Sequence, residues 1–415
     1  MISKGRVIRT GLFFAIANFL LTAIIGVLLR YNTLFPISGL TDRYWIHAHS
    51  HIGFLGWVFM ALTILGFALL LPKSAKINRR VYRLMVYVQV SIIGMLATFP
   101  FMGYAAPSIL FSTFHMALSF AFVWVFYKHS EKQQLSNRFM KAGLIFMLVS
   151  GIGPLALGPI IIGGYRGTDW YDMAIYFYLH FQYNGWFTLA VFALVLKVME
   201  QFGIQINEKR GNLLFRLLVL GTIMTLTLSA LGFESIMYLR VFGAIGALLQ
   251  LWGGFILLKM IFDRNDLPKV INSKWVKWFF GIALFSWLLK IMMQFLSAIP
   301  LVTDFVYLSR DAIMTYLHLS FLGFTSCFII GLLILKNYLK TNTRIARLGY
   351  VVFIVSIVMM ELTIGLRSIP QYLNLEFYTS INILLFAESL ILLLSISIVL
   401  FYGFILSNRV VKQKS

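Results

Sequence analysis

Long apolar runs separated by short polar connections recur along the whole chain. A helix that crosses the hydrocarbon core of a bilayer needs about 20 apolar residues, and twelve runs approach or exceed that length. The connections are short, so we expect one all-α, multi-pass integral membrane domain over residues 1–415. The predicted spans, I to XII, cover residues 11–29, 44–71, 81–101, 107–127, 142–162, 171–198, 213–233, 238–261, 275–296, 312–335, 349–369 and 378–406.

The first run resembles a signal peptide, because Lys4, Arg6 and Arg9 precede it. A signal peptide has an apolar core of about 7–15 residues and a small-residue cleavage site. This run of 19 residues is longer and has no clear site of that kind. We therefore expect it to stay as span I.

The composition supports the membrane class. Hydrophobic residues make up 60% of the chain and charged residues 12%, whereas soluble proteins carry about 25% charged residues. This balance excludes a soluble enzyme, a disordered scaffold and a nucleic-acid-binding module. The single cysteine, Cys327, excludes a disulfide or a thiolate zinc site within the chain.

The positive charges predict the orientation in the membrane. The formal net charge is +21, with 35 lysines and arginines. Lys290 lies inside span IX. Only six of these cations lie in or beside alternate connections, and all the others lie at the two termini or in and beside the remaining connections. Positive connections face the cytoplasm, so we expect cytoplasmic termini in a cell's inner membrane, with a basic face toward lipid rather than nucleic acid. The six cations are Arg30, Arg43, Arg166, Arg240, Arg310 and Arg367.

Four histidines are predicted to share one depth in the membrane. His51, His180 and His318 lie eight, eight and seven residues after the outer charges Arg43, Asp172 and Asp311 that precede spans II, VI and X. His115 lies eight residues after Pro107, where span IV begins. At 1.5 Å per residue this is roughly 10–12 Å below the outer end of each span. Ionisable groups inside a bilayer are costly and mark functional sites, and imidazoles suit haem iron, copper or non-haem iron. For His115, a hydrogen bond to a neighbouring carbonyl explains the residue equally well.

Three of these histidines begin the same short motif. His51, His180 and His318 are each followed, five residues later, by glycine and then an aromatic residue. The histidines are 129 and 138 residues apart, which is four spans each time. We therefore predict a threefold pseudo-repeat of four-helix units, approximately over residues 1–140, 141–272 and 273–415. The glycines leave room for a flat macrocycle or for a neighbouring helix.

These motifs resemble the large subunit of haem–copper oxidases, most of all its nitric oxide reductase branch. Residues 49–51 read H-S-H where the family has H-T-N in helix II. Residues 180–185 read H-F-Q-Y-N-G where helix VI has H-x-x-x-E-G, and residues 316–323 read Y-L-H-L-S-F-L-G where helix X has H-A-H-G-A-L-F-G. Residues 49–56 are also similar to the H-A-H-E-M-L-F-G of the NnrS family of haem- and copper-associated membrane proteins.

The resemblance implies a b-type haem held by helices II and X. His318 matches the second histidine of the helix X pair. On helix II, the internal repeat favours His51 and the H-T-N comparison favours His49. Tyr316 stands where the family has its second haem ligand, and tyrosine can ligate haem iron. Arg367 matches the arginines that hold haem propionates.

The resemblance also implies a second metal, copper or non-haem iron, with His180 as a ligand and His115 as a candidate beside it. The chain departs from the family here, because residues 213–233 contain no histidine and Asn184 replaces the glutamate or tyrosine of helix VI. A standard binuclear centre is therefore not expected. An oxidoreductase activity stays open.

Three functions remain after this comparison. The first is a haem protein that transfers electrons, or handles nitric oxide or oxygen, with a separate electron-donor subunit. The second is a twelve-helix secondary transporter, for which Lys290 and Glu361 are the candidate charges inside the membrane. The third is a haem-binding sensing or assembly subunit without turnover. Lys290, Glu361 and Glu388 are also explained by pairing with one another across helices.

Overall fold

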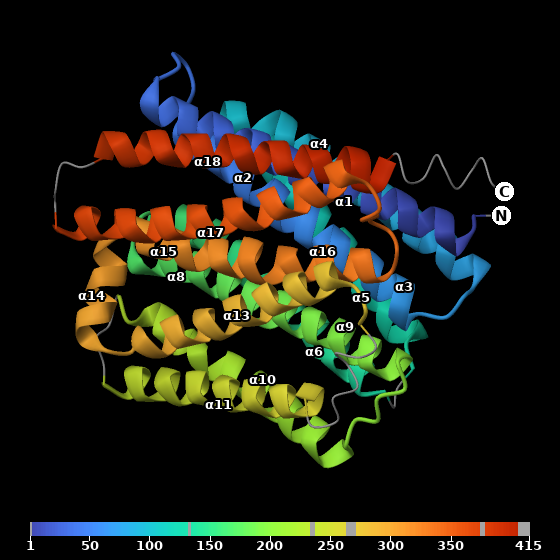
Figure 1. Cartoon of the computed structure of the whole chain (residues 1–415). Helices are drawn as coiled ribbons and strands as arrows, with labels where there is room; N and C mark the ends of the chain where they lie inside the picture. Colours follow the sequence, from blue (N-terminus) through green and yellow to red (C-terminus); the bar gives the residue numbers. More distant parts are fainter. Residues whose placement is uncertain (1, 132–133, 233–236, 263–270, 374–377, 406–415) are drawn as a thin grey trace. The chain divides into compact units, whose positions relative to one another are not determined.

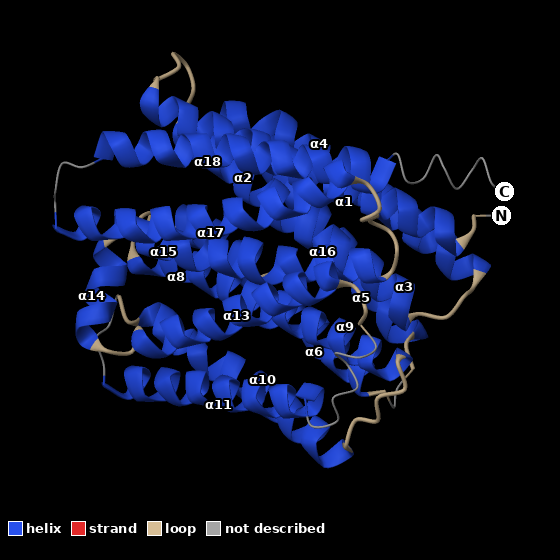
Figure 2. Ribbon diagram, viewed as in Figure 1, coloured by secondary structure: helices blue, strands red, loops and turns tan. Residues whose placement is uncertain are grey.

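The computed structural model describes residues 2–131, 134–232, 237–262, 271–373 and 378–405. Within these ranges the chain forms helices and no strand (Figure 2). The helices divide into two compact units. Unit 1 comprises residues 1–129 and 329–415, and unit 2 comprises residues 130–328.

Figure 1 follows the helices in chain order from blue to red. Unit 1 contains α1 (Lys4–Leu34), α2 (Asp42–His51), η1 (Ile52–Phe59), α3 (Met60–Leu70), α4 (Ala75–Met102), α5 (Ala106–His129), α17 (Arg344–Leu373), α18 (Tyr378–Ile398) and η5 (Val399–Ile405). Unit 2 contains α6 (Leu135–Ser150), α7 (Ile152–Ile162), α8 (Asp169–Leu179), η2 (His180–Phe187), α9 (Thr188–Gln201), α10 (Glu208–Thr225), η3 (Leu226–Ala230), α11 (Met237–Phe262), α13 (Lys274–Leu296), α14 (Pro300–Leu308), α15 (Arg310–His318) and η4 (Leu319–Ser326). Helix α16 (Cys327–Leu335) begins in unit 2 and ends in unit 1.

The prediction of twelve spans is confirmed. Twelve helical runs of the described chain are long and apolar enough to cross a membrane, and each overlaps one predicted span. The predicted ends at residues 233 and 406 lie outside the described residues. Several helices are longer than their apolar core: α1 begins at Lys4, where the Ser3 hydroxyl accepts a hydrogen bond from the Arg6 amide. Basic side chains continue a helix into the interface, because their apolar stems stay in lipid while their charges reach water.

Spans II, VI and X differ from the other nine in burial. In each of them 83% of the most apolar window is buried, compared with at most 50% in any other span. These are the spans that carry the repeated histidines. Their side chains therefore face protein on nearly all sides, whereas the other spans present a broad face to lipid.

One helix was not predicted. Helix α14 lies in the connection between spans IX and X, and its apolar run is too short to cross a bilayer. Proline in its first turn suits a helix start. Arg240 was predicted in an outer connection, but it lies in α11 and is 7% exposed. It donates to the Thr303 hydroxyl (2.6 Å) and to the Ala298 carbonyl (3.1 Å). These two bonds anchor the start of α14.

The apolar core of unit 1 is closely packed around Trp57. The rings of Phe19 in α1 and Trp57 in η1 stack with centroids 4.5 Å apart, and Phe353 of α17 meets Phe19 edge-on at 6.1 Å. A cavity of about 10 Å³ remains beside them, lined by apolar side chains only. Stacked and edge-to-face rings of this kind stabilise a core beyond their buried area.

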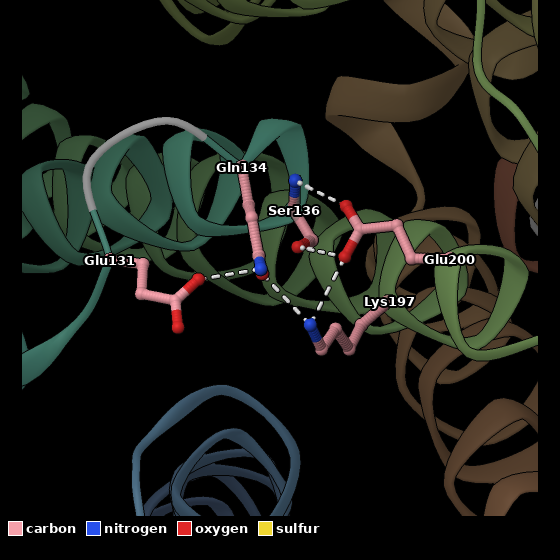
Figure 3. A network of polar contacts seen from close by, with 5 residues as sticks. All are labelled: Glu131, Gln134, Ser136, Lys197 and Glu200. Carbon is pink, nitrogen blue, oxygen red and sulfur yellow. Dashed lines mark hydrogen bonds and ion pairs between the residues drawn. The ribbon is translucent and has the colours of Figure 1, made fainter.

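A polar network ties α6 to α9 in unit 2 (Figure 3). Glu200 accepts hydrogen bonds from the amide and the hydroxyl of Ser136, at 3.4 and 3.0 Å. Lys197 donates to Glu200 (3.2 Å) and to Gln134 (2.8 Å), and Gln134 donates to Glu131 (2.6 Å). The Ser136 amide lies in the first turn of α6 and has no carbonyl partner within that helix. Glu200 therefore caps α6 from a second helix.

Candidate functional site

Each of the three repeated motifs coincides with a π-helical segment. His51 directly precedes η1, His180 is the first residue of η2, and His318 directly precedes η4; each segment is eight residues long. A π-helix is rare and occurs mostly as a single turn inserted in an α-helix, frequently at a functional site. The three segments thus share a local structure as well as a sequence. The repeat of whole four-helix units stays a prediction.

Hydroxyl side chains support two of these segments. The Thr188 hydroxyl donates to the Tyr183 carbonyl (2.8 Å), and the Thr325 hydroxyl to the Ser320 carbonyl (2.9 Å), each five residues back. In η1, the side-chain amide of Asn18 donates to the Gly56 carbonyl from α1 (3.1 Å). The wider turn leaves carbonyls in need of donors, and these side chains supply them.

The motif glycines make room for a neighbouring helix. A Cβ on Gly56 would lie 2.9 Å from Asn18 of α1. On Gly185 it would lie 2.6 Å from Phe146 of α6, and on Gly323 it would lie 2.6 Å from Ser286 of α13. The approaching residue belongs each time to the span directly before the motif, so close helix packing explains the three glycines.

His51 and His318 are held in the same way. Nδ1 of His51 lies 2.8 Å from the His47 carbonyl, and Nδ1 of His318 lies 2.9 Å from the Met314 carbonyl, four residues back in both cases. A carbonyl can only accept, so each Nδ1 carries the proton and Nε2 is the unprotonated nitrogen of the neutral ring. Metal-ligating histidines typically donate their second ring nitrogen to a carbonyl in this manner.

Aromatic rings surround His51 within unit 1. Its ring centroid lies 4.5 Å from that of Phe99 in α4 and 6.0 Å from that of Tyr104. Its Nε2 has no hydrogen-bond partner among the described residues. The side chain therefore offers one lone pair in mainly apolar surroundings.

His49 occupies a different side of the same helix. Its ring packs over Gly26 of α1, where an added Cβ would lie 3.2 Å from the imidazole Cε1. The two histidines are only two residues apart, so they point about 200° apart around α2. His51 shares with His318 the bond from Nδ1 to the carbonyl four residues back, and the contacts of His49 do not show such a bond.

His180 is held by both of its ring nitrogens. Nε2 donates to the Thr222 carbonyl of α10 (2.8 Å), and Nδ1 accepts from the Asn184 amide (3.2 Å). Asn184 in turn accepts from the Tyr316 hydroxyl (3.0 Å). His180 and Tyr316, two predicted ligands, therefore lie in one buried hydrogen-bonded chain that links η2, α10 and α15. A metal at His180 requires one of these two bonds to be given up.

Lys290 lies beside this network and is 1% exposed. Its ammonium donates to the Thr188 hydroxyl (3.4 Å) and lies 5.7 Å from the ring centroid of Phe324 and 6.0 Å from that of Tyr183. Within the described part of unit 2 it has no carboxylate partner. Aromatic faces stabilise the cation in place of a counter-ion.

His115 is buried in unit 1 and packs against Phe59, with ring centroids 5.0 Å apart. Its Nδ1 lies 3.4 Å from the Ser119 hydroxyl. Its Nε2 is buried and has no hydrogen-bond partner among the described residues. His115 thus presents an unsatisfied nitrogen.

The remaining charged candidates lie on α17 and α18 of unit 1. Arg367 donates to the Asn382 side chain (2.7 Å). Glu388 accepts from the Thr363 hydroxyl (2.8 Å), and both carboxylate oxygens of Glu361 are buried without a hydrogen-bond partner among described residues. Among all the residues that the structure describes, no group of three or more His, Cys, Asp or Glu side chains is arranged to hold a metal ion.

Sequence reasoning missed the partners that orient the rings. The carbonyl acceptors at His47 and Met314 belong to ordinary positions four residues back, and spacing alone does not show that a ring uses them. Thr222 lies 42 residues from His180 and contributes its backbone, which no side-chain motif records.

No known family profile and no curated protein sequence matches this chain. The solved cryo-EM structure of a heme-copper terminal oxidase dimer shares its fold, with a TM-score of 0.66 at 12% sequence identity. The alignment covers 95% of this chain and 82% of that chain. At this identity the likeness concerns the fold alone, so this multi-pass chain is similar in fold to a heme-copper terminal oxidase.

Proposed function

We propose that this chain is a membrane protein that would bind b-type haem, with His51 and His318 as candidate ligands through Nε2. One observation carries the proposal: of the three histidines in the repeated motif, these two alone donate Nδ1–H to the carbonyl four residues back. That bond fixes the tautomer that a haem ligand requires. The fold likeness to a heme-copper terminal oxidase supports a haem protein, not the choice of ligands.

The donor set fits haem better than a cage of protein ligands. A haem needs one donor on a face of its iron, whereas a protein-held metal ion needs three or four. His51 offers one free lone pair beside the ring of Phe99. Among these two histidines we therefore assign His51, rather than His49, as the helix II ligand.

A bound b-type haem supplies one-electron chemistry at its iron. The residues of this chain would contribute orientation: the His47 and Met314 carbonyls hold the imidazole N–H groups, and the Phe99 ring lies beside His51. Arg367 is proposed as a propionate partner. Its guanidinium donates to the Asn382 side chain (2.7 Å), and charge-assisted hydrogen bonds of this kind suit a carboxylate.

For a second metal, copper or non-haem iron, the chain offers less. His180 has both ring nitrogens in hydrogen bonds, and Tyr316 donates into the same network. His115 offers one nitrogen. We therefore assign His180, Asn184 and Tyr316 to a structural network, and propose electron transfer or binding of a diatomic gas rather than reduction at a binuclear centre.

The proposed setting is a cell's inner membrane with both termini in the cytoplasm and a separate electron-donor subunit. The alternation of lysine and arginine between connections supports this orientation. A haem-binding sensing or assembly role shares every feature above, and differs only in showing no consumption of gas with an electron donor.

A secondary transporter is the second candidate, because two ionisable groups inside the spans have no counter-ion among the described residues. These are Lys290 in unit 2 and Glu361 in unit 1. Charged groups inside transporters often mark substrate or proton paths. The candidate predicts a protein without haem.

The deciding experiment is the reduced-minus-oxidised absorption spectrum of detergent-purified protein from haem-replete cells, with iron and copper analysis of the same sample. We expect a b-type spectrum that is lost in His51→Ala and in His318→Ala and kept in His49→Ala. A featureless, metal-free sample would contradict the proposal and favour the transporter. Copper or additional iron that disappears in His180→Ala would restore the second metal.

A further inference from the structure

A basic hollow lies where the start of α1 meets the start of α4 in unit 1. Its volume is about 380 Å³, and no acidic side chain lines it. Helix α1 begins and helix α3 ends beside it, so it lies at the ends of two spans, where lipid phosphates are found. The lining residues are Ile2, Ser3, Lys4, Lys73, Ser74, Ala75 and Asn78.

Two lysines give the hollow its charge. Lys4 is fixed there, because its ammonium donates to the Leu71 carbonyl (2.7 Å) and lies 5.1 Å from the centre of the Phe67 ring. Lys73 is close enough for the two ammonium groups to repel each other. An anion between them converts this repulsion into two attractive contacts.

The start of α4 adds backbone donors. Ser74 is the N-cap residue, yet its side chain makes no capping hydrogen bond. The first amides of a helix have no carbonyl partner within it, and they bind phosphate groups readily. The N-terminal end of the helix dipole adds positive potential at the same place.

Asn78 supplies an independent sign of a missing ligand. Its side chain is 7% exposed and donates from Nδ2 to the Ile2 carbonyl (3.2 Å). Its Oδ1 is buried without a donor among the residues described. A buried acceptor left unpaired is costly, so the ligand of this hollow should carry a hydroxyl or amine donor as well as an anion.

We propose that this hollow binds the headgroup of an anionic phospholipid that bears hydroxyls, such as phosphatidylglycerol. The phosphate lies between Lys4, Lys73 and the first amides of α4, and a headgroup hydroxyl donates to Asn78. This site is separate from the proposed haem ligands, and its test does not depend on haem.

The experiment uses the full-length protein in phosphatidylcholine vesicles, with and without phosphatidylglycerol, followed by native mass spectrometry of retained lipid. Lys73→Ala should weaken phosphatidylglycerol retention about fivefold, the effect of one lysine near a membrane surface. The matched control is Lys76→Ala, which removes an exposed lysine of the same turn that does not line the hollow. An equal loss in both variants would overturn the proposal in favour of general charge attraction.

Two further arms test the headgroup. Asn78→Leu should weaken retention of phosphatidylglycerol but leave that of phosphatidylmethanol, which has no headgroup hydroxyl, unchanged. Equal loss of both lipids would contradict the role of Asn78. Displacement of phosphatidylglycerol by inorganic phosphate at millimolar concentration would overturn the lipid and assign the hollow to a soluble anion.

Discussion

The segments around His51 and His180 share a motif and a π-helical turn, yet they hold their imidazoles in opposite ways. At His51 the proton is on Nδ1 and stays within its own helix, at the His47 carbonyl. At His180 the proton is on Nε2 and reaches the Thr222 carbonyl of another helix. The first arrangement keeps a lone pair for a ligand, and the second uses both nitrogens to join helices.

This difference shows that a repeated residue need not have a repeated role. The motif determines where a histidine lies along the span. The neighbouring backbone and side chains determine which ring nitrogen carries the proton. Asn184 shows the effect, because its amide occupies the one nitrogen of His180 that remains as an acceptor.

The largest expected effect is a loss of haem absorption, which should occur in a variant of His51 but not in a variant of His180. His51→Ala should remove the b-type absorption, because it deletes a proposed haem ligand, whereas His180→Ala should keep it. The measurement is the reduced-minus-oxidised spectrum per mole of purified protein. Loss of haem in His180→Ala, with His51→Ala unaffected, would reverse the assignment of roles.

The next effect tests the packing that the two segments share. Gly185→Ala should lower the free energy of unfolding by about 1–3 kcal/mol, the usual effect of overpacking, because the new Cβ would lie 2.6 Å from Phe146. Gly281→Ala is the matched control, since Gly281 lies in α13 with no atom within 4 Å of an added Cβ. Unfolding in detergent, followed by circular dichroism, measures both variants.

If Gly185→Ala is neutral, the glycine is kept for something other than helix packing. A macrocycle that approaches η2 would then regain support. The control should be neutral or stabilised by up to about 1 kcal/mol, because alanine favours a helix over glycine.

The sequence was sufficient for the spans, whereas the common depth of the histidines stays a prediction. Twelve apolar runs of bilayer length leave little freedom, since every backbone group inside a membrane must be bonded within the structure. The structure confirms the runs and brings His180, Asn184 and Tyr316 together. Helix α14 was missed because a short apolar run in a connection fits several structures.

The roles of individual histidines could not be predicted, for a physical reason. Whether a ring ligates a metal depends on its tautomer, and the tautomer depends on acceptors that are distant in sequence or belong to the backbone. The carbonyl of Thr222 leaves no mark on the residue type at position 222. The proposal of His51 rather than His49 likewise rests on the bond from His51 Nδ1 to the His47 carbonyl, which spacing alone does not show.

A smaller effect is expected within the network of His180. Tyr316→Phe removes the hydroxyl that donates to Asn184 and should destabilise the protein by about 1 kcal/mol, the net value of one hydrogen bond. The spectrum of the proposed haem should not change, because we assign this network a structural role. A shift of the haem absorption bands in this variant would place Tyr316 beside the cofactor, as the resemblance implies.

The smallest effect concerns the end of span VI, in α9. There Lys197 and Glu200 form an ion pair, and their side chains are 16% and 23% exposed. Lys197→Met should lower the free energy of unfolding by only about 0.2–1 kcal/mol, because pairs near solvent gain little. Glu200→Ala should have the larger effect of the two, since it also uncaps α6 at Ser136. Urea unfolding at low and high salt checks this order. If Lys197→Met destabilises the protein more than Glu200→Ala, charge pairing rather than capping holds α9 to α6. Polar contacts would then stabilise the end of span VI as strongly as the His180 network stabilises its centre.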